Sequence, residues 1–162
     1  MFRSYSTMKH IVVIVFLIIG AFGFSQENWE PKADTILANA TAQLGVPYKW
    51  GTNNPNVSFD CSGFTSYVYS SADVDNSRSS KAYAALGTKV SLEECRKGDC
   101  IVFSGTAPGS TSPGHVGIVV SHTEEGIQFI HCSSSKNHYG VVITDYYASN
   151  YPKRFLQVRR LF

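Results

Sequence analysis

The sequence predicts an α+β fold in which N-terminal helices precede an antiparallel sheet. Two observations carry this prediction: helical periodicity is confined to residues 31–71, and short β-branched or aromatic segments occupy residues 99–160. Clusters of Gly, Ser, Pro and Asn separate those segments, as turns separate strands. A run of strands after a run of helices is the order typical of α+β proteins.

Residues 31–44 are expected to form the first, amphipathic helix. Pro31 suits a first helical turn, because its missing N–H would have no partner there. Apolar residues then recur at helical spacing from Ile36 to Leu44. Gly45 stands where a C-terminal cap belongs.

The next segments are shorter. Residues 46–51 form an extended piece, and residues 52–59 form a loop because of their Asn and Pro turn chemistry. A second helix is expected to begin at Asp60 or Cys61 and to end at about Ser71. Residues 73–85 are polar and leave room for one further short helix.

The second half of the chain contains the expected strands, each short and bounded by turn residues. We expect them at residues 99–104, 114–121, 127–132, 141–144 and 155–160.

Composition limits the class of protein. The 162 residues are 43% hydrophobic and 16% charged, which is enough for one domain with a packed core. The net charge is only +2, and the basic residues are scattered apart from Arg159 and Arg160. Nucleic acid is therefore not expected as a partner. The sequence is silent on oligomeric state.

The N-terminus has the layout of a secretory signal peptide. Arg3 and Lys9 supply positive charge, and an apolar run of 14 residues follows from Ile11 to Phe24. A membrane anchor is the alternative, but a spanning helix needs about 20 apolar residues. We therefore expect cleavage after Ser25, with residues 1–25 as signal peptide, 26–32 as linker and 33–162 as the catalytic domain. The protein would be exported to the periplasm, cell envelope or extracellular space, without stable membrane insertion.

Export makes disulfides possible for the four cysteines, although a domain of this size does not need them. Cys100 lies in an apolar run and is expected in the core. Cys132 follows His131 directly, so on a strand the two side chains would face opposite ways. No cysteine or histidine spacing of the zinc type occurs, and neither a metal nor a cofactor is expected.

Three residues suggest nucleophilic catalysis. Cys61 opens a predicted helix, where backbone N–H groups and the helix dipole would lower the pKa of its thiol. His115 begins a predicted strand beside a loop of small residues and could act as the base. His131 lies on a later strand and could orient His115, as in nucleophile–base–orienter triads. An isolated histidine is more often a satisfied core residue, but the trio together favours catalysis.

Neighbours of Cys61 have smaller expected roles. Asp60 is interpreted as the helix cap and not as a catalytic group, because a carboxylate beside a thiolate would raise the thiol pKa. Ser62 and Gly63 leave the sulfur uncovered, and backbone N–H groups there could stabilise an oxyanion. Trp50 suits packing in the core or at the rim. Tyr48 could pack in the same way or direct its hydroxyl to an oxyanion.

Five strings of the sequence resemble the NlpC/P60 family of bacterial cell-wall cysteine peptidases. They occur in the family's order from about residue 33 to 162: Gly45-Val46-Pro47-Tyr48-Lys49-Trp50-Gly51, Phe59-Asp60-Cys61-Ser62-Gly63-Phe64, Lys97-Gly98-Asp99, Gly114-His115-Val116-Gly117-Ile118 and Phe129-Ile130-His131. The resemblance implies a reduced papain-like fold, with the Cys-bearing helix packed on a five- to six-stranded antiparallel sheet.

By position, the resemblance makes Cys61 the nucleophile, His115 the base and His131 the third residue, and it favours a functional Tyr48. It also implies a substrate, the peptidoglycan stem peptide, cut between γ-D-glutamate and the following diamino acid. Three alternatives stay open: an N-acetylmuramoyl-L-alanine amidase, an acyl or peptide transferase, and a catalytically inactive wall-binding module. Thr52 departs from the family, which often has a second glycine there.

Overall fold

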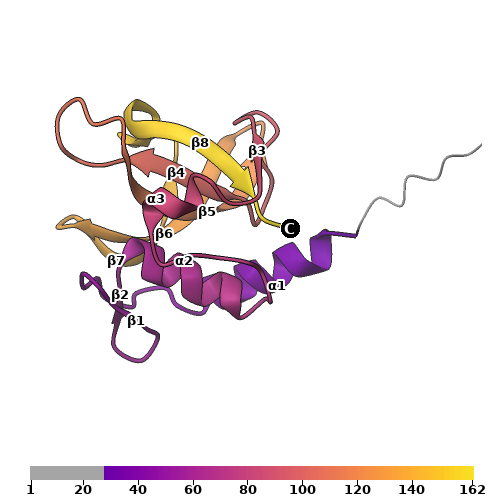
Figure 1. Cartoon of the computed structure of the whole chain (residues 1–162), viewed down its shortest axis with the longest axis horizontal. Helices are drawn as coiled ribbons and strands as arrows, with labels where there is room; N and C mark the ends of the chain where they lie inside the picture. The colour runs from indigo at the N-terminus through magenta and orange to yellow at the C-terminus, as the bar shows by residue number, and fades with distance from the viewer. Residues whose placement is uncertain (1–27) are drawn as a thin grey trace, which may run out of the picture.

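The computed structural model describes residues 28–162, which form an α+β domain with a six-stranded antiparallel sheet (Figure 1). In chain order the elements are α1 (Glu30–Thr41), β1 (Asn53–Asn54), β2 (Ser58–Phe59), α2 (Cys61–Ser70), α3 (Ser80–Tyr83), β3 (Thr88–Val90), β4 (Cys100–Ser104), β5 (Pro113–Thr123), β6 (Gly126–Ser135), β7 (His138–Asp145), the 3-10 helix η1 (Tyr151–Arg154) and β8 (Phe155–Arg160). The strand order across the sheet is β3-β8-β4-β5-β6-β7, and the α+β prediction is confirmed.

Helix α1 begins one residue before the predicted start and ends three residues early, at Thr41. Its buried residues, Ala33, Ile36 and Ala40, have the expected helical spacing. Leu44 is exposed and does not extend this stripe. The helix ends at the C-cap Ala42, and Gly45, at φ +83°, then turns the chain and donates its N–H to the carbonyl of Val141 on β7.

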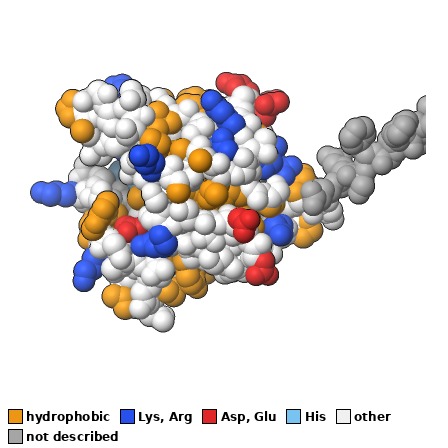
Figure 2. Space-filling model, in the orientation of Figure 1, with side chains coloured by type: hydrophobic (Ala, Val, Ile, Leu, Met, Phe, Trp, Pro, Cys, Tyr) orange, Lys and Arg blue, Asp and Glu red, His pale blue; other side chains and the backbone are white. Residues whose placement is uncertain are grey.

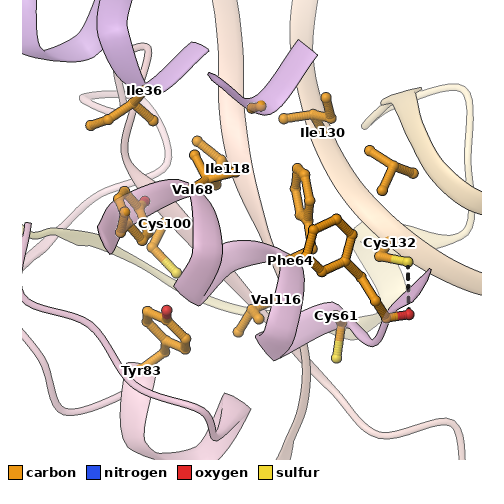
Figure 3. Packing of buried hydrophobic residues seen from close by; sticks show 14 of the residues in the cluster. Ile36, Cys61, Phe64, Val68, Tyr83, Cys100, Val116, Ile118, Ile130 and Cys132 are labelled. Carbon is orange, nitrogen blue, oxygen red and sulfur yellow. Dashed lines mark hydrogen bonds between the residues drawn. The ribbon is translucent and has the colours of Figure 1, made fainter. Parts of the chain in front are cut away.

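Helix α2 matches its prediction and carries Cys61 as its first residue. Phe64 and Val68 project from one side of the helix into the core that it shares with Val116 and Ile130 of the sheet (Figure 3). Each side chain of this kind contributes roughly 1.5–3 kcal/mol when fully buried. This packing fixes the height of the helix above the sheet, and thereby the place of Cys61 over β5.

The five expected strands are present, and β8 has its predicted bounds. Strands β5, β6 and β7 are longer than predicted, because their ends continue the ladder as exposed hairpins. Strand β3 was missed: its three residues pair with β8 at the sheet edge and are too short to show alternation. The loop expected at residues 52–59 contains the two-residue pairing of β1 with β2. The extended piece at residues 46–51 forms only a single bridge, from Tyr48 to Phe59.

The sheet buries both of its faces. One face carries the helices, and the other holds an aromatic core that includes Phe103, Phe129 and Tyr146, with the partly buried Phe155 packed against it. On the face drawn in Figure 2, Lys and Arg side chains lie scattered among other side chains and form no continuous stripe. None of the helices in residues 28–162 is both long and apolar enough to cross a membrane. The expected signal peptide, residues 1–25, lies outside the described residues.

Candidate active site

Cys61 lies where the α2 helix meets strand β5. Its side chain is 6% exposed. The backbone N–H groups of Val116, Ser62 and Cys61 itself surround the sulfur and favour its thiolate. Val116 directly follows His115 in the chain, so the sulfur lies beside the peptide that leads into the candidate base. The structure thus brings the Cys61 sulfur to the peptide that joins His115 to Val116, although Cys61 and His115 are 54 positions apart in the sequence.

The expected lowering of the Cys61 pKa is not found. Burial raises the pKa of this thiol, and the Asp60 carboxylate adds to the rise, against the three N–H groups that lower it. The helix start supplies the predicted local effect, but desolvation of a buried thiolate outweighs it. Burial and Asp60 thus both favour the neutral thiol over the thiolate in the substrate-free site.

His115 and His131 form a direct pair. Their Nε2 and Nδ1 atoms lie 2.8 Å apart, and His131 Nε2 lies 3.0 Å from Thr144 Oγ1. His131 is buried, and its ring stacks on Phe129 with centroids 4.8 Å apart. The contact between His115 and His131 that the sequence suggested is therefore present in the structure. No hydrogen bond joins the Cys61 sulfur to the His115 ring within residues 28–162. Such bonds are often long in substrate-free sites.

The histidine pair is held neutral. Burial lowers the pKa of His115, and the Arg154 guanidinium lowers it further. Burial also lowers the pKa of His131, with His115 and Arg154 adding to the effect. If His131 donates from Nε2 to Thr144, its Nδ1 accepts a hydrogen bond from His115 Nε2–H. That tautomer leaves His115 Nδ1 as the nitrogen free to take a proton.

Sequence reasoning missed Tyr151 and Arg154 of η1. The Tyr151 hydroxyl lies 3.4 Å from His115 Nε2 and 3.5 Å from His131 Nδ1. The Arg154 guanidinium lies 5.3 Å from the centroid of the Tyr151 ring and donates to the Ser104 carbonyl. Nothing in a short turn segment signals these contacts. Thr144 was also missed, although strand alternation puts it on the face that Phe129 and His131 share.

Asp60 is the helix cap, as expected. Its carboxylate accepts hydrogen bonds from the N–H of Gly63 at 2.6 Å and of Gly51 at 2.8 Å. It also pairs with the Arg78 guanidinium at 3.3 Å. The Ser62 hydroxyl donates to the Arg78 carbonyl or to Asp60, so it is occupied by structural contacts. Arg78 lies in a polar segment that gave no signal in the sequence.

Position 63 needs a glycine because the capping network leaves no space for a Cβ atom there. A Cβ atom there would lie 2.0 Å from the Thr52 carbonyl oxygen and 2.2 Å from Arg78 Nη1. We expect Gly63→Ala to lower the free energy of unfolding by about 1–3 kcal/mol through overpacking, although alanine is the better helix former. Urea unfolding would measure the change.

Gly105→Ala is the matched control, because its Cβ would meet only the flexible Ser110 side chain at 3.3 Å or beyond. We expect this variant to unfold close to wild type. Equal stability of the two variants would show that the neighbours of position 63 do not exclude a Cβ atom.

A cleft of about 270 Å³ opens in front of Cys61. Its lining includes Trp50, Cys61, Ser62, Arg78 and Gly114. Trp50 is 81% exposed at the rim of this cleft, so a core position for Trp50 is wrong and a rim position is correct. The cleft therefore leaves space directly beside the thiol.

Tyr48 lies near the thiol and is half-buried. Burial raises the pKa of its hydroxyl to about 12, with smaller contributions from Cys61 and Asp60. The hydroxyl therefore stays protonated at neutral pH and can donate a hydrogen bond. Tyr139 donates its own hydroxyl to the Tyr48 carbonyl and fixes the backbone there.

The raised pKa of Cys61 can be tested by measuring how the alkylation rate of this thiol depends on pH. Because burial raises this pKa, the thiolate fraction at neutral pH is lower than that of a free cysteine, and it grows as pH rises. We expect the rate of iodoacetamide alkylation at Cys61 to rise with pH. The midpoint pH of this rise should lie above the midpoint pH for N-acetylcysteine. Mass spectrometry of the Cys61 peptide over a pH series would measure it. A midpoint below the free thiol would mean that a thiolate–imidazolium pair already exists without substrate.

All four cysteines are free thiols in the structure. Cys100 is fully buried, as predicted. Cys132 donates from its sulfur to the Phe59 carbonyl at 3.2 Å, and in Figure 3 the Cys61 sulfur points away from it. Within residues 28–162, no group of three His, Cys, Asp or Glu side chains is arranged to hold a metal ion.

Comparison with known proteins shows which family of proteins the chain resembles. Residues 45–160 match the model of the NlpC/P60 family. The chain is 32% identical over 140 residues to gamma-DL-glutamyl hydrolase of Bacillus subtilis, covering 86% of this chain and 32% of that protein. It thus spans about a third of the length of this relative.

Solved structures of the same family have a similar fold. An NlpC/P60 family protein from Bacillus cereus superposes with a TM-score of 0.70 at 29% identity, covering 80% of this chain and 40% of that one. The NlpC/p60 domain of the peptidoglycan hydrolase SagA superposes with a TM-score of 0.61 at 28% identity, covering 80% of this chain and 98% of that domain.

Proposed function

The chain belongs to the NlpC/P60 family, and on that premise we propose that it is an exported cysteine peptidase of the bacterial cell wall. Its substrate would be the peptidoglycan stem peptide, cut between γ-D-glutamate and the following diamino acid. The names of the relatives support this choice, since one is a gamma-DL-glutamyl hydrolase and another a peptidoglycan hydrolase domain.

One observation carries the proposal. The Cys61 sulfur lies against the N–H of Val116, and the residue before Val116 is a histidine whose far nitrogen contacts His131 at 2.8 Å. A thiol, a neutral imidazole and a group that orients the imidazole are the parts of a nucleophilic acyl-transfer site.

The first half of the reaction would form an acyl-enzyme. His115 Nδ1 takes the proton of Cys61 as the sulfur attacks the carbonyl carbon of the scissile amide. Backbone N–H groups around Cys61, with the Tyr48 hydroxyl, would stabilise the oxyanion of the tetrahedral intermediate. The intermediate collapses when His115 gives its proton to the departing amine, which leaves a thioester on Cys61.

The second half would release the product. His115, neutral again, takes a proton from water as that water attacks the thioester carbonyl. The C–S bond breaks, the carboxylic acid leaves, and the proton returns to the sulfur. His131 accepts a hydrogen bond from His115 Nε2–H throughout and would stabilise the imidazolium that forms twice in each cycle.

Digestion of purified peptidoglycan with mass analysis of the products tests the proposal. Fragments that end in γ-D-glutamate, with new diamino-acid amines, are expected. Release of whole stem peptides beginning at L-alanine would instead identify an amidase, and cross-linked products would identify a transferase. No released fragment at all would leave the wall-binding module as the function.

Export and domain boundaries are part of the same proposal. Residues 1–25 would be removed as a signal peptide, and residues 33–162 would act as the catalytic domain. The family match at residues 45–160 lies within that range. N-terminal sequencing of the protein recovered from the cell envelope or medium is expected to begin at Gln26. Recovery of the uncleaved chain from the membrane fraction would contradict it.

A further inference from the structure

A third side chain lies at the edge of the contact between the two histidines. The hydroxyl oxygen of Tyr151 is 3.4 Å from His115 Nε2 and 3.5 Å from His131 Nδ1, and these two nitrogens are 2.8 Å apart. The three atoms thus form a closed triangle. A hydroxyl both donates and accepts hydrogen bonds, so it suits a place beside one ring N–H and one ring nitrogen with a lone pair.

We propose that Tyr151 is a positioning residue, whose hydroxyl keeps water away from the hydrogen bond between His115 and His131 and so holds the His115 imidazole in its catalytic orientation. This role rests on the proposed function, because the orientation of His115 affects a reaction only if this imidazole activates Cys61. Tyr151 does not line the cleft in front of Cys61, so it would act through the histidines.

Water can approach the histidine pair from the side away from Cys61. A cavity of about 540 Å³ lies there, and its lining includes His131, Thr144 and Tyr151 but not His115. A polar cavity of this size has room for several water molecules. Tyr151 lines the cavity and contacts His115, so its hydroxyl occupies the position from which water would reach the pair. Water at that position would donate to His131 Nδ1 and compete with His115 Nε2–H for the same lone pair.

The Tyr151 ring is fixed by packing that does not depend on its hydroxyl. Its centroid lies 4.5 Å from that of Phe103 and 4.9 Å from that of Phe129, in the aromatic core of the sheet. Arg154, one turn later on η1, lies 5.3 Å from the ring centroid and donates to the Ser104 carbonyl of β4 through Nε at 3.2 Å and Nη2 at 2.6 Å. Tyr151→Phe should therefore keep the ring in place and remove only the hydroxyl.

The Tyr151 hydroxyl carries its proton at neutral pH. Burial raises the pKa of Tyr151 to about 12, although the charge of Arg154 and a hydrogen bond from its guanidinium both act to lower this pKa. The O–H hydrogen is therefore available to the ring nitrogens, as the proposed role requires.

Steady-state kinetics of Tyr151→Phe test the role in catalysis. On a synthetic γ-D-glutamyl peptide, kcat is expected to fall by about threefold to tenfold, the fold-change that one hydrogen bond of ordinary strength supplies. KM should stay at the wild-type value, because the hydroxyl does not line the cleft beside Cys61. A loss confined to KM, or no loss at all, would overturn the proposal.

Tyr146→Phe is the matched control. Tyr146 belongs to the same aromatic core and is 3% exposed, and its hydroxyl makes no hydrogen bond to either histidine within residues 28–162. This variant loses a comparable buried hydroxyl and should cleave as wild type does. Urea unfolding would compare the stability of the two variants. An equal fall of kcat in both would identify a packing effect and contradict a positioning role.

An NMR measurement separates this role from the proposed function. The ring N–H proton between His115 and His131 is expected to give a resolved signal in wild type, because Tyr151 keeps it from exchanging with water. In Tyr151→Phe a water molecule can enter the space of the hydroxyl. The signal should then be lost under the same conditions, whereas Tyr146→Phe should retain it.

The outcomes of the two measurements are distinguishable. Loss of the signal in Tyr151→Phe alone would support the shielding by Tyr151 even if wild type cleaves no substrate, a result that would defeat the proposed peptidase. A signal that is absent from wild type, or retained in Tyr151→Phe, would overturn the role of Tyr151 even if cleavage occurs.

Discussion

The Cys61→Ala protein is expected to release no stem-peptide fragments from purified peptidoglycan. Without the sulfur no acyl-enzyme can form, and His115 has no nucleophile to activate. Loss of a nucleophile from a catalytic triad lowers kcat on the order of 10⁶-fold. The measurement is the mass spectrum of soluble products after digestion by equal amounts of wild type and variant. The methyl group of alanine fits the space of the thiol, so folding should be retained.

Cys100→Ala provides the matched control. Cys100 is a fully buried thiol in the same core cluster, on β4 and not at the start of α2. This variant loses one buried sulfur and about 1 kcal/mol of stability, and it should cleave as wild type does. Circular dichroism would confirm that both variants are folded. Fragments released by Cys61→Ala at more than a small fraction of the wild-type rate would show that Cys61 is not the nucleophile.

Local signals made the Cys61 half of the site predictable. Asp60 before a helical pattern predicts a cap, and the cap geometry follows, with the Gly63 N–H on the Asp60 carboxylate. The helix that begins at Cys61 has the predicted start because capping and periodicity are properties of neighbouring residues. The bounds of β8 were also predictable from local composition, because its β-branched and aromatic residues follow a cluster of turn residues.

The pKa of Cys61 could not be obtained in this way. Its helix position favours the thiolate, but burial depends on how α2 lies against β5, which is tertiary. Local pattern therefore predicts that the helix start lowers the pKa of Cys61, but it cannot predict the larger rise that desolvation causes. Tyr151 and Arg154 could not be predicted as site residues for a related reason. They lie on a short 3-10 helix that reaches the histidines only because β8 pairs with β4.

The meeting of His115 and His131 depends on register. Alternation places His131 on the same face as Phe129, but alternation alone does not say which residue of β5 lies beside it. Gly117 helps to settle this: a Cβ there would lie 2.9 Å from the Ile130 carbonyl oxygen and 3.1 Å from His131 Cβ. Gly117 therefore lets β6 lie close to β5 beside the candidate base His115.

Replacement of His131 with leucine is expected to lower kcat/KM by roughly 10²–10⁴-fold. Leucine fills much of the buried volume but accepts no hydrogen bond, so His115 Nε2–H loses its partner at 2.8 Å. The His115 ring could then carry its proton on Nδ1, the nitrogen that must accept from Cys61. Steady-state kinetics on a synthetic γ-D-glutamyl peptide would measure the loss. His122→Leu is the control, because it removes an exposed imidazole whose hydrogen bonds within residues 28–162 all go to Cys95.

The variant His131→Asn tests whether His131 contributes by orienting His115 or only by filling space. Its amide oxygen can accept from His115 Nε2–H, as the asparagine of papain-like Cys-His-Asn sites does. If His131 acts by holding the tautomer of His115, asparagine should recover about 10-fold or more of the activity that leucine loses. If it acts only by filling space, the two variants should be equally active, and both should track the loss of stability measured by thermal unfolding. Recovery by asparagine without recovery of stability would separate orientation from packing, because the hydrogen bond to His115 is the one feature that asparagine restores and leucine does not.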